Sequence, residues 1–190
     1  MLTQRKSAAL IALGSNLSWN GKQSVEILRA SLVALAENGV PAAQISRFFR
    51  TPCFPAGAGP DYVNAAAILE GNLDAAQILA ILHQVEEQFG RERARRWGGR
   101  TLDLDLLAVG DTVAPDVATW RVWRNLAVDR QLKDAPDQLI LPHPRLQDRA
   151  FVLVPLAEVA PDWVHPVHQL TVSAMVAALP PADVEQVRPL

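Results

Sequence analysis

The sequence is poor in the features that define several classes of protein. It has a single cysteine, Cys53, so no disulfide can form within the chain, and we expect a reducing compartment, the cytoplasm. No stretch approaches the roughly 18–20 consecutive apolar residues of a membrane-spanning helix. The net charge of −2 argues against a general binder of nucleic acid or of anionic membranes. We therefore expect neither nucleic acid nor a membrane among its partners.

The first apolar stretch, residues 8–13, follows Arg5 and Lys6 and so faintly resembles a secretory signal. It is shorter than the core of about 7–15 apolar residues that such signals carry, and no small-residue cleavage site follows it. We interpret it as a first β-strand. With 190 residues, of which 49% are apolar, the chain can bury a sizeable core. We expect one domain over residues 1–190, with a long connection or insertion at about 111–137.

Hydrophobic periodicity predicts the order of the secondary structure. Alternating or continuous apolar runs predict strands at 8–13, 45–51, 62–69 and 101–109, and three- and four-residue spacing predicts helices at 24–38 and 74–89. This β-α-β-β-α-β order is typical of an α+β, ferredoxin-like fold, an antiparallel sheet with helices packed on it. Beyond it we expect a C-terminal extension: an irregular stretch at 111–137, an ordered pattern over 138–160 and a short helix at 171–179.

The strand sequence RTLDLDLL, residues 100–107, has leucines on one face and Asp103 and Asp105 on the other. The two carboxylates are about 6–7 Å apart at a rise of ~3.3 Å per residue, and without a positive partner they repel each other. Carboxylate oxygens suit Mg²⁺, and two ions about 3.5–4 Å apart fit this spacing. The alternative is the solvated outer face of an edge strand.

A basic segment precedes these aspartates. It contains Arg91, Arg93, Arg95, Arg96 and Arg100, with Trp97-Gly98-Gly99 inside it. Guanidinium groups match phosphate oxygens, and glycines allow a loop to close over a ligand. A solvated basic loop is the alternative, but the neighbouring carboxylates favour a polyphosphate site.

Two further groups of residues are candidates for ligand binding. Tyr62 and Asn64 share one face of a predicted strand and, with Phe151, suit a flat heterocycle; core aromatics with a satisfied asparagine are the alternative. His143 is held between Pro142 and Pro144, where it could contact phosphate or act as an acid or base. A purely structural histidine is the other interpretation.

Six segments, taken in order, resemble the 6-hydroxymethyl-7,8-dihydropterin pyrophosphokinase family of folate biosynthesis. They cover most of residues 8–161 and are ALGSNL (12–17), FFRTP (48–52), PDYVNAA (60–66), RWGGRTLDLDLL (96–107), LPHPRL (141–146) and RAFVLVPLAEVAP (149–161). The resemblance implies transfer of pyrophosphate from ATP to the hydroxymethyl oxygen of the pterin, which leaves AMP. ATP and hydroxymethyl-dihydropterin would be the partners of a monomer.

The resemblance also implies roles for individual residues. Asp103 and Asp105 would hold two Mg²⁺ ions and form the catalytic group with Arg93 and Arg100. The ATP-binding residues would be Glu86, Arg91, Trp97, His143 and Arg149. The pterin-binding residues would be Thr51, Pro52, Phe54, Tyr62, Asn64 and Phe151, with Tyr62 and Phe151 on the two faces of the ring.

Three positions depart from the family pattern: His83, where glutamine is frequent, Gln138, where an arginine can serve, and Cys53, where proline is common. The connection at 111–137 is also longer than the family's minimal form, and its TWRVWRNL (119–126) could be a helix that covers the site, packs on the core or mediates self-association. The main alternative function is a non-catalytic relative that binds pterin or nucleotide on the same fold. A metal-dependent nuclease is disfavoured by the net charge and by the pterin-type residues.

Overall fold

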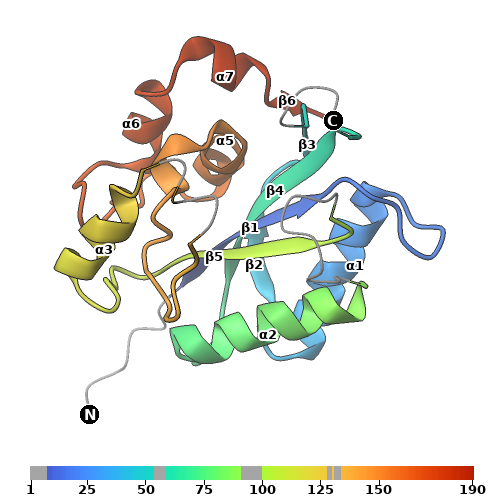
Figure 1. Ribbon diagram of the computed structural model, residues 1–190. Coiled ribbons are helices and arrows are strands. Elements are labelled where there is room, and N and C mark those ends of the chain that lie inside the picture. The colour runs from blue at the N-terminus through green and yellow to red at the C-terminus, as the bar shows by residue number, and fades with distance from the viewer. Residues whose placement is uncertain (1–7, 54–58, 91–99, 128–129, 131–133) are drawn as a thin grey trace.

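The computed structural model describes residues 8–53, 59–90, 100–127, 130 and 134–190, and its centre is one antiparallel sheet (Figure 1). Four strands make up the body of this sheet: β1 (Ala9–Ser15), β3 (Phe49–Thr51), β4 (Tyr62–Leu69) and β5 (Asp103–Val109). The order is β5-β1-β4-β3-β6, where β6 is the short strand Arg188–Pro189. The predicted antiparallel, ferredoxin-like arrangement is thus confirmed.

The second predicted strand is split in two. β2 (Ala42–Ile45) and β3 both pair with β4, but they are separated at residues 46–48. Ser46 lies at the break, where its hydroxyl accepts the N–H of Ala66 at 2.9 Å. The N–H of Ser46 still donates to the carbonyl of Ala66 at 2.9 Å, so the side chain replaces one of the two bonds of the backbone ladder at this point. The apolar pattern of 45–51 did not predict this break.

Helices α1 (Ser24–Glu37) and α2 (Ala75–Gln88) cover one face of the sheet (Figure 1). Asp74 caps α2 by accepting the N–H of Gln77 at 2.8 Å. Apolar side chains of β1 and β5, among them Ile11 and Leu104, are buried against these two helices. Both helices match their predicted positions closely.

The C-terminal part covers the other face of the sheet. It contains α3 (Val117–Arg124), the 3-10 helix η1 (Leu146–Asp148), α5 (Ala150–Val159), α6 (Val172–Ala177) and α7 (Pro181–Glu185). Helix α5 packs on β4, and Leu10 and Leu107 are buried in a second core beneath it. The short helix expected at 171–179 is confirmed as α6, whereas α3 lies within a stretch that we expected to be irregular. No helix among the described residues is long and apolar enough to cross a membrane.

Candidate functional site

Each aspartate of β5 faces an arginine. Asp103 and Asp105 lie on the same face of the strand, with side chains 22% and 34% exposed. The guanidinium of Arg100 pairs with the carboxylate of Asp103, and Nη1 of Arg149 lies 3.7 Å from Oδ2 of Asp105. These two arginines balance the repulsion expected from the sequence. The site therefore collects both the carboxylates that suit a cation and the guanidinium groups that suit phosphate.

Asn16 fixes the backbone of Arg100. The sequence alone suggested no role for Asn16. The buried Asn16 side chain accepts the N–H of Arg100 through Oδ1 at 2.7 Å and donates through Nδ2 to the carbonyl of Pro60 at 3.1 Å. Its own N–H donates to the carbonyl of Arg100 at 2.9 Å. Asn16 thus joins the end of β1 to the start of the aspartate strand. The turn sequence Gly14-Ser15-Asn16 at the end of a buried strand was the available signal.

Glu86, which the resemblance placed near the nucleotide, supports the strand from behind. Its side chain is 1% exposed, and Oε1 accepts the N–H of Leu104 at 2.7 Å. Leu104 lies between the two aspartates, so Glu86 holds the strand at the level of the site. A direct contact between Glu86 and nucleotide stays a prediction.

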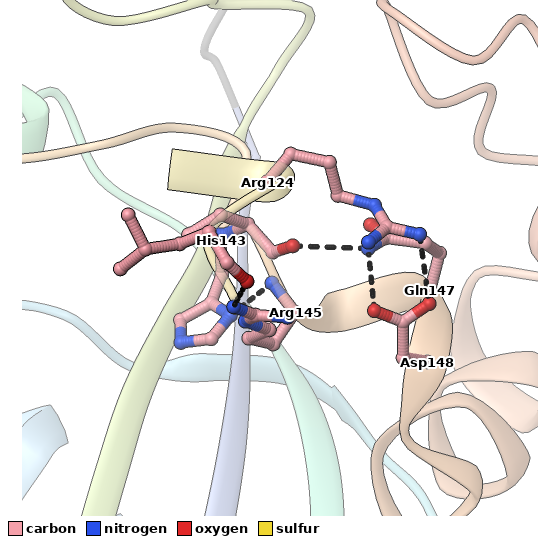
Figure 2. A network of polar contacts seen from close by, with 7 residues as sticks. Arg124, His143, Arg145, Gln147 and Asp148 are labelled. Atoms are coloured by element: carbon pink, nitrogen blue, oxygen red, sulfur yellow. Dashed lines mark hydrogen bonds and ion pairs between the residues drawn. The ribbon is translucent and has the colours of Figure 1, made fainter. Parts of the chain in front are cut away.

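The segment Leu141–Arg149 carries His143 toward the aspartates. The backbone N–H of His143 donates to the carbonyl of Leu107 on β5 at 2.8 Å, and Nδ1 accepts the N–H of Arg145 at 3.1 Å. Burial, together with the charges of Arg149 and Arg145, lowers the pKa of His143 to about 3. At neutral pH the ring is therefore uncharged, and Nε2 carries its hydrogen. Figure 2 shows His143 beside Arg145 and the residues that follow it.

A cavity of about 470 Å³ opens beside this segment. Its polar lining includes Asp105, Asp134, Asp137, His143, Arg145 and Arg149, and two of the three departures from the family pattern, His83 and Gln138, also line it. The remaining lining is apolar and comes from α2, β5 and the chain after β5: Leu79, Leu104, Leu106, Trp123, Leu126, Pro136, Leu139, Ile140 and Pro144. A cavity with a charged part and an apolar part suits a nucleotide.

Two lining residues, Arg145 and Trp123, were missed as site residues. Arg145 follows Pro144 in the quoted LPHPRL segment, so its basic character beside His143 was the signal. Trp123 lies on α3, in the stretch whose role the sequence left open. Nothing in its local pattern distinguishes it from the neighbouring Trp120, which is buried.

Thr51, Tyr62 and Asn64 meet where β3 pairs with β4, since Thr51 is directly opposite Tyr62. The buried Asn64 donates through Nδ2 to Oγ1 of Thr51 at 2.6 Å. A Cβ on Gly14 would lie 3.1 Å from Oδ1 of Asn64, so glycine at this position leaves room for the amide. Burial raises the pKa of Tyr62, while the positive charge of Arg100 lowers it. Tyr62 is therefore within electrostatic reach of the arginine that pairs with Asp103.

Two other residues of the predicted pterin-binding set, Phe151 and Pro52, are exposed. Phe151, on α5, is 40% exposed, and the Arg149 guanidinium carbon lies 5.7 Å from the centre of its ring. Pro52 is exposed after β3. Phe54, Arg91, Arg93 and Trp97 lie outside the described residues.

The donor set at β5 fits a magnesium ion that arrives with phosphate. Within the described ranges no group of three or more His, Cys, Asp or Glu side chains could hold a metal ion. Two carboxylates with substrate phosphates and water complete the oxygen coordination that Mg²⁺ takes. Asp103 and Asp105 are such a pair.

Comparison with known proteins gives a consistent set of similarities. The family model "7,8-dihydro-6-hydroxymethylpterin-pyrophosphokinase (HPPK)" matches residues 10–161. A 2-amino-4-hydroxy-6-hydroxymethyldihydropteridine pyrophosphokinase of Synechocystis is 37% identical over 164 residues, 86% of this chain and 71% of the relative. Enzymes of the same name from Haemophilus influenzae and Methylorubrum extorquens are 36% and 32% identical, and the matches cover 87% and 98% of those proteins.

Solved structures share the fold. A crystal structure of an HPPK-DHPS with substrates matches 91% of this chain with a TM-score of 0.65 and 11% identity. The Plasmodium falciparum wild-type HPPK-DHPS matches 93% with a TM-score of 0.62 and 14% identity. This chain spans 43% and 45% of those two chains.

Proposed function

The chain belongs to the 7,8-dihydro-6-hydroxymethylpterin-pyrophosphokinase family, and on that premise we propose that it transfers pyrophosphate from ATP to the hydroxymethyl oxygen of 7,8-dihydro-6-hydroxymethylpterin. The observation that carries this proposal is the position of Asp105, His143 and Arg149 around one cavity, next to Asp103 and Arg100. Tyr62 is within reach of Arg100 on the other side. These positions support a polyphosphate site next to a site for a flat ring.

The charged part of the cavity is assigned to the triphosphate. We propose that Asp103 and Asp105 hold two Mg²⁺ ions, which when bound neutralise phosphate charge and orient the phosphate oxygens. Arg149 and the neutral His143 donate to phosphate oxygens, and Arg100 turns from Asp103 toward the reacting phosphate. Arg91, Arg93 and Trp97 are proposed to cover the nucleotide.

The apolar part is assigned to the adenine base. Leu79, Leu106 and Ile140 line this part of the cavity, and we propose that the base packs against them and stacks on Trp123, which also lines it. His83 and Gln138 supply polar groups at the edge of this part of the cavity. The nucleotide would then lie with its phosphates toward β5.

The pterin is assigned to the Thr51–Asn64 pair. Their amide and hydroxyl groups, with Pro52 and Phe54 nearby in the chain, recognise the polar edge of the ring, and Tyr62 and Phe151 contact its faces. This arrangement points the hydroxymethyl group toward Asp103 and Arg100.

In the reaction the pterin hydroxymethyl oxygen attacks the β-phosphorus of ATP in line. The new oxygen–phosphorus bond forms as the bond between the β-phosphorus and the oxygen bridging to the α-phosphate breaks, and AMP leaves with that oxygen. The arginines stabilise the charge that develops on the phosphate oxygens. The hydroxyl proton passes to Asp105 or to water. We assign His143 to phosphate binding and not to proton transfer, because its pKa of about 3 makes it a poor base.

We further propose that residues 1–190 form one domain that acts as a monomer in the cytoplasm. The single Cys53 agrees with a reducing compartment.

Identification of the products by phosphorus NMR tests this function. With Mg²⁺, ATP and the pterin, the chain should form a pterin diphosphate and AMP. Formation of ADP and a pterin monophosphate would show transfer of the γ-phosphoryl group and would contradict the proposal. Binding of both substrates without product would favour the non-catalytic alternative.

A further inference from the structure

The stretch that joins β5 to the His143 segment contacts this segment at several points. Backbone hydrogen bonds pair Ala114 with Leu141 in both directions, at 2.9 and 3.0 Å. In the next turn of the connection, on α3, the indole N–H of Trp120 donates to the carbonyl of Pro142 at 2.7 Å. The residue immediately before His143 is thus held by a buried side chain from α3.

Contacts near the end of α3 reach the other end of the same segment. Nη2 of Arg124 lies 3.0 Å from Oδ1 of Asp148, next to Arg149, and Nη2 of Arg145 donates to the carbonyl of Leu126 at 3.5 Å. Figure 2 shows Arg124 reaching from α3 toward Asp148 and Gln147. Both ends of Pro142–Arg149 are therefore attached to α3 or to the chain just after it.

Trp120 is itself firmly fixed. It is 1% exposed, and its ring lies 5.3 Å, centre to centre, from those of His165 and His168, in edge-to-face geometry. α3 therefore packs on the chain around His165 and His168, and the segment that carries His143, Arg145 and Arg149 contacts both α3 and β5.

The charges around Asp148 suggest what Arg124 does. Arg124, Arg145 and Arg149 are close enough to influence one another: burial is the main cause that lowers the pKa of Arg145, Arg124 and Arg149 lower it further, and Asp148 raises it. Arg124 engages Asp148, while Arg149 faces Asp105. Without Arg124, Oδ2 of Asp148 would still accept from Nε2 of Gln147 at 3.2 Å, but Oδ1 would lose its partner. The freed oxygen would then draw Arg145 away from the cavity that it lines.

We propose that Trp120 and Arg124 of α3 are positioning residues for the reaction. Trp120 fixes the backbone before His143, and Arg124 occupies Asp148 so that Arg145 and Arg149 remain directed at the triphosphate. This inference rests on the proposed function. It gives the connection at 111–137, whose role the sequence left open, a task in substrate binding.

The test compares Arg124→Ala with a rescue variant, Arg124→Ala/Asp148→Asn, and with Arg121→Ala, an exposed arginine of the same helix. Arg124→Ala should lower kcat/KM for ATP by about ten- to a hundredfold. Removal of the freed carboxylate in the double variant should restore most of that loss, and Arg121→Ala should behave as the wild type. Trp120→Phe keeps an aromatic side chain but removes the indole N–H and should also lower kcat/KM.

Two further measurements separate the possible outcomes. In calorimetry with Mg²⁺ and a non-hydrolysable ATP analogue, Arg124→Ala should bind the analogue more weakly than the wild type, the double variant and Arg121→Ala. The inference can therefore be tested even if the wild type proves catalytically inactive. The melting temperature should change little between Arg124→Ala and Arg121→Ala. Equal kcat/KM values for these two variants, or a loss that follows melting temperature and is not rescued by Asp148→Asn, would overturn the positioning role. If the wild type is active and Arg124→Ala has the same kcat/KM for ATP, this inference is wrong but the proposed function stands.

Discussion

Glu86 and Leu104 are joined by a hydrogen bond behind the aspartate pair: Oε1 of the buried carboxylate accepts the backbone N–H of Leu104 at 2.7 Å. β5 lies at one end of the sheet, so this N–H has no neighbouring strand on that side. The side chain from α2 takes the place of a strand partner at the residue between Asp103 and Asp105. The direction of both carboxylates therefore depends on a helix on the opposite side of the site.

We predict that Glu86→Ala destabilises the fold and lowers activity. Loss of the acceptor leaves a buried N–H without a partner, which costs about 1–3 kcal/mol. Glu86→Gln retains an acceptor oxygen and should lose less. Urea unfolding and kcat would be measured for both, with the exposed neighbour Glu87→Ala as the control. Equal stability of the Glu86→Ala and Glu87→Ala variants would show that the hydrogen bond is unimportant.

Asp103→Asn and Asp105→Asn should each reduce kcat by at least about a hundredfold, since each removes a negative oxygen that we propose as a ligand of Mg²⁺. Circular dichroism should show an intact fold, because both side chains are partly exposed. Asp111→Asn, an exposed aspartate just after β5, is the matched control. Full activity in either test variant, at any Mg²⁺ concentration, would remove that aspartate from the metal site.

Acid should destabilise the protein through His143. Its pKa is about 3 in the folded chain, mainly because of burial, and about 6.5 when unfolded. The unfolded state therefore binds more protons between these values, and stability falls as the pH drops from about 6.5 toward 3. His165, with a pKa lowered to about 4 chiefly by burial, acts in the same direction.

Melting temperatures measured from pH 8 to pH 4 check this prediction. The wild type should lose stability below about pH 6.5, and His143→Gln should lose it less steeply. Parallel curves for the two proteins would mean that His143 titrates normally in the folded state.

Trp123→Ala should weaken binding of ATP more than it lowers kcat, because the indole lines the apolar part of the cavity. The expected increase in Kd is about tenfold, the effect of losing one aromatic contact. Val122→Ala, at an exposed position of the same helix, is the control. If nucleotide affinity is the same in both variants, the base does not lie against Trp123.

Local patterns predicted the central fold well, because alternating and helical spacing record which face of an element is buried. Leu102, Leu104 and Leu106 are buried as their spacing indicates. The split at Ser46 was missed because it depends on a hydrogen bond to Ala66 on another strand. The place of helix α3 was left open because its one buried residue, Trp120, packs against His165 and His168, far along the chain.

The site was predictable to a similar extent. The charge conflict between Asp103 and Asp105 was visible in the sequence, and Arg100 stood close enough to be assigned to the same site. The approach of Arg149 to Asp105 at 3.7 Å is a product of tertiary structure, because these residues are far apart in the sequence. The neutral state of His143 likewise depends on burial and on the nearby arginines. The assigned ligand contacts themselves stay predictions.

The measurement that tests the central claim most directly is release of AMP from Mg²⁺-ATP with and without 7,8-dihydro-6-hydroxymethylpterin. The account predicts that AMP forms only when the pterin is present, in equal amount to the pterin diphosphate, and that Asp105→Asn abolishes both products. Release of AMP at the same rate without the pterin, or no AMP from the wild type with both substrates, would contradict it.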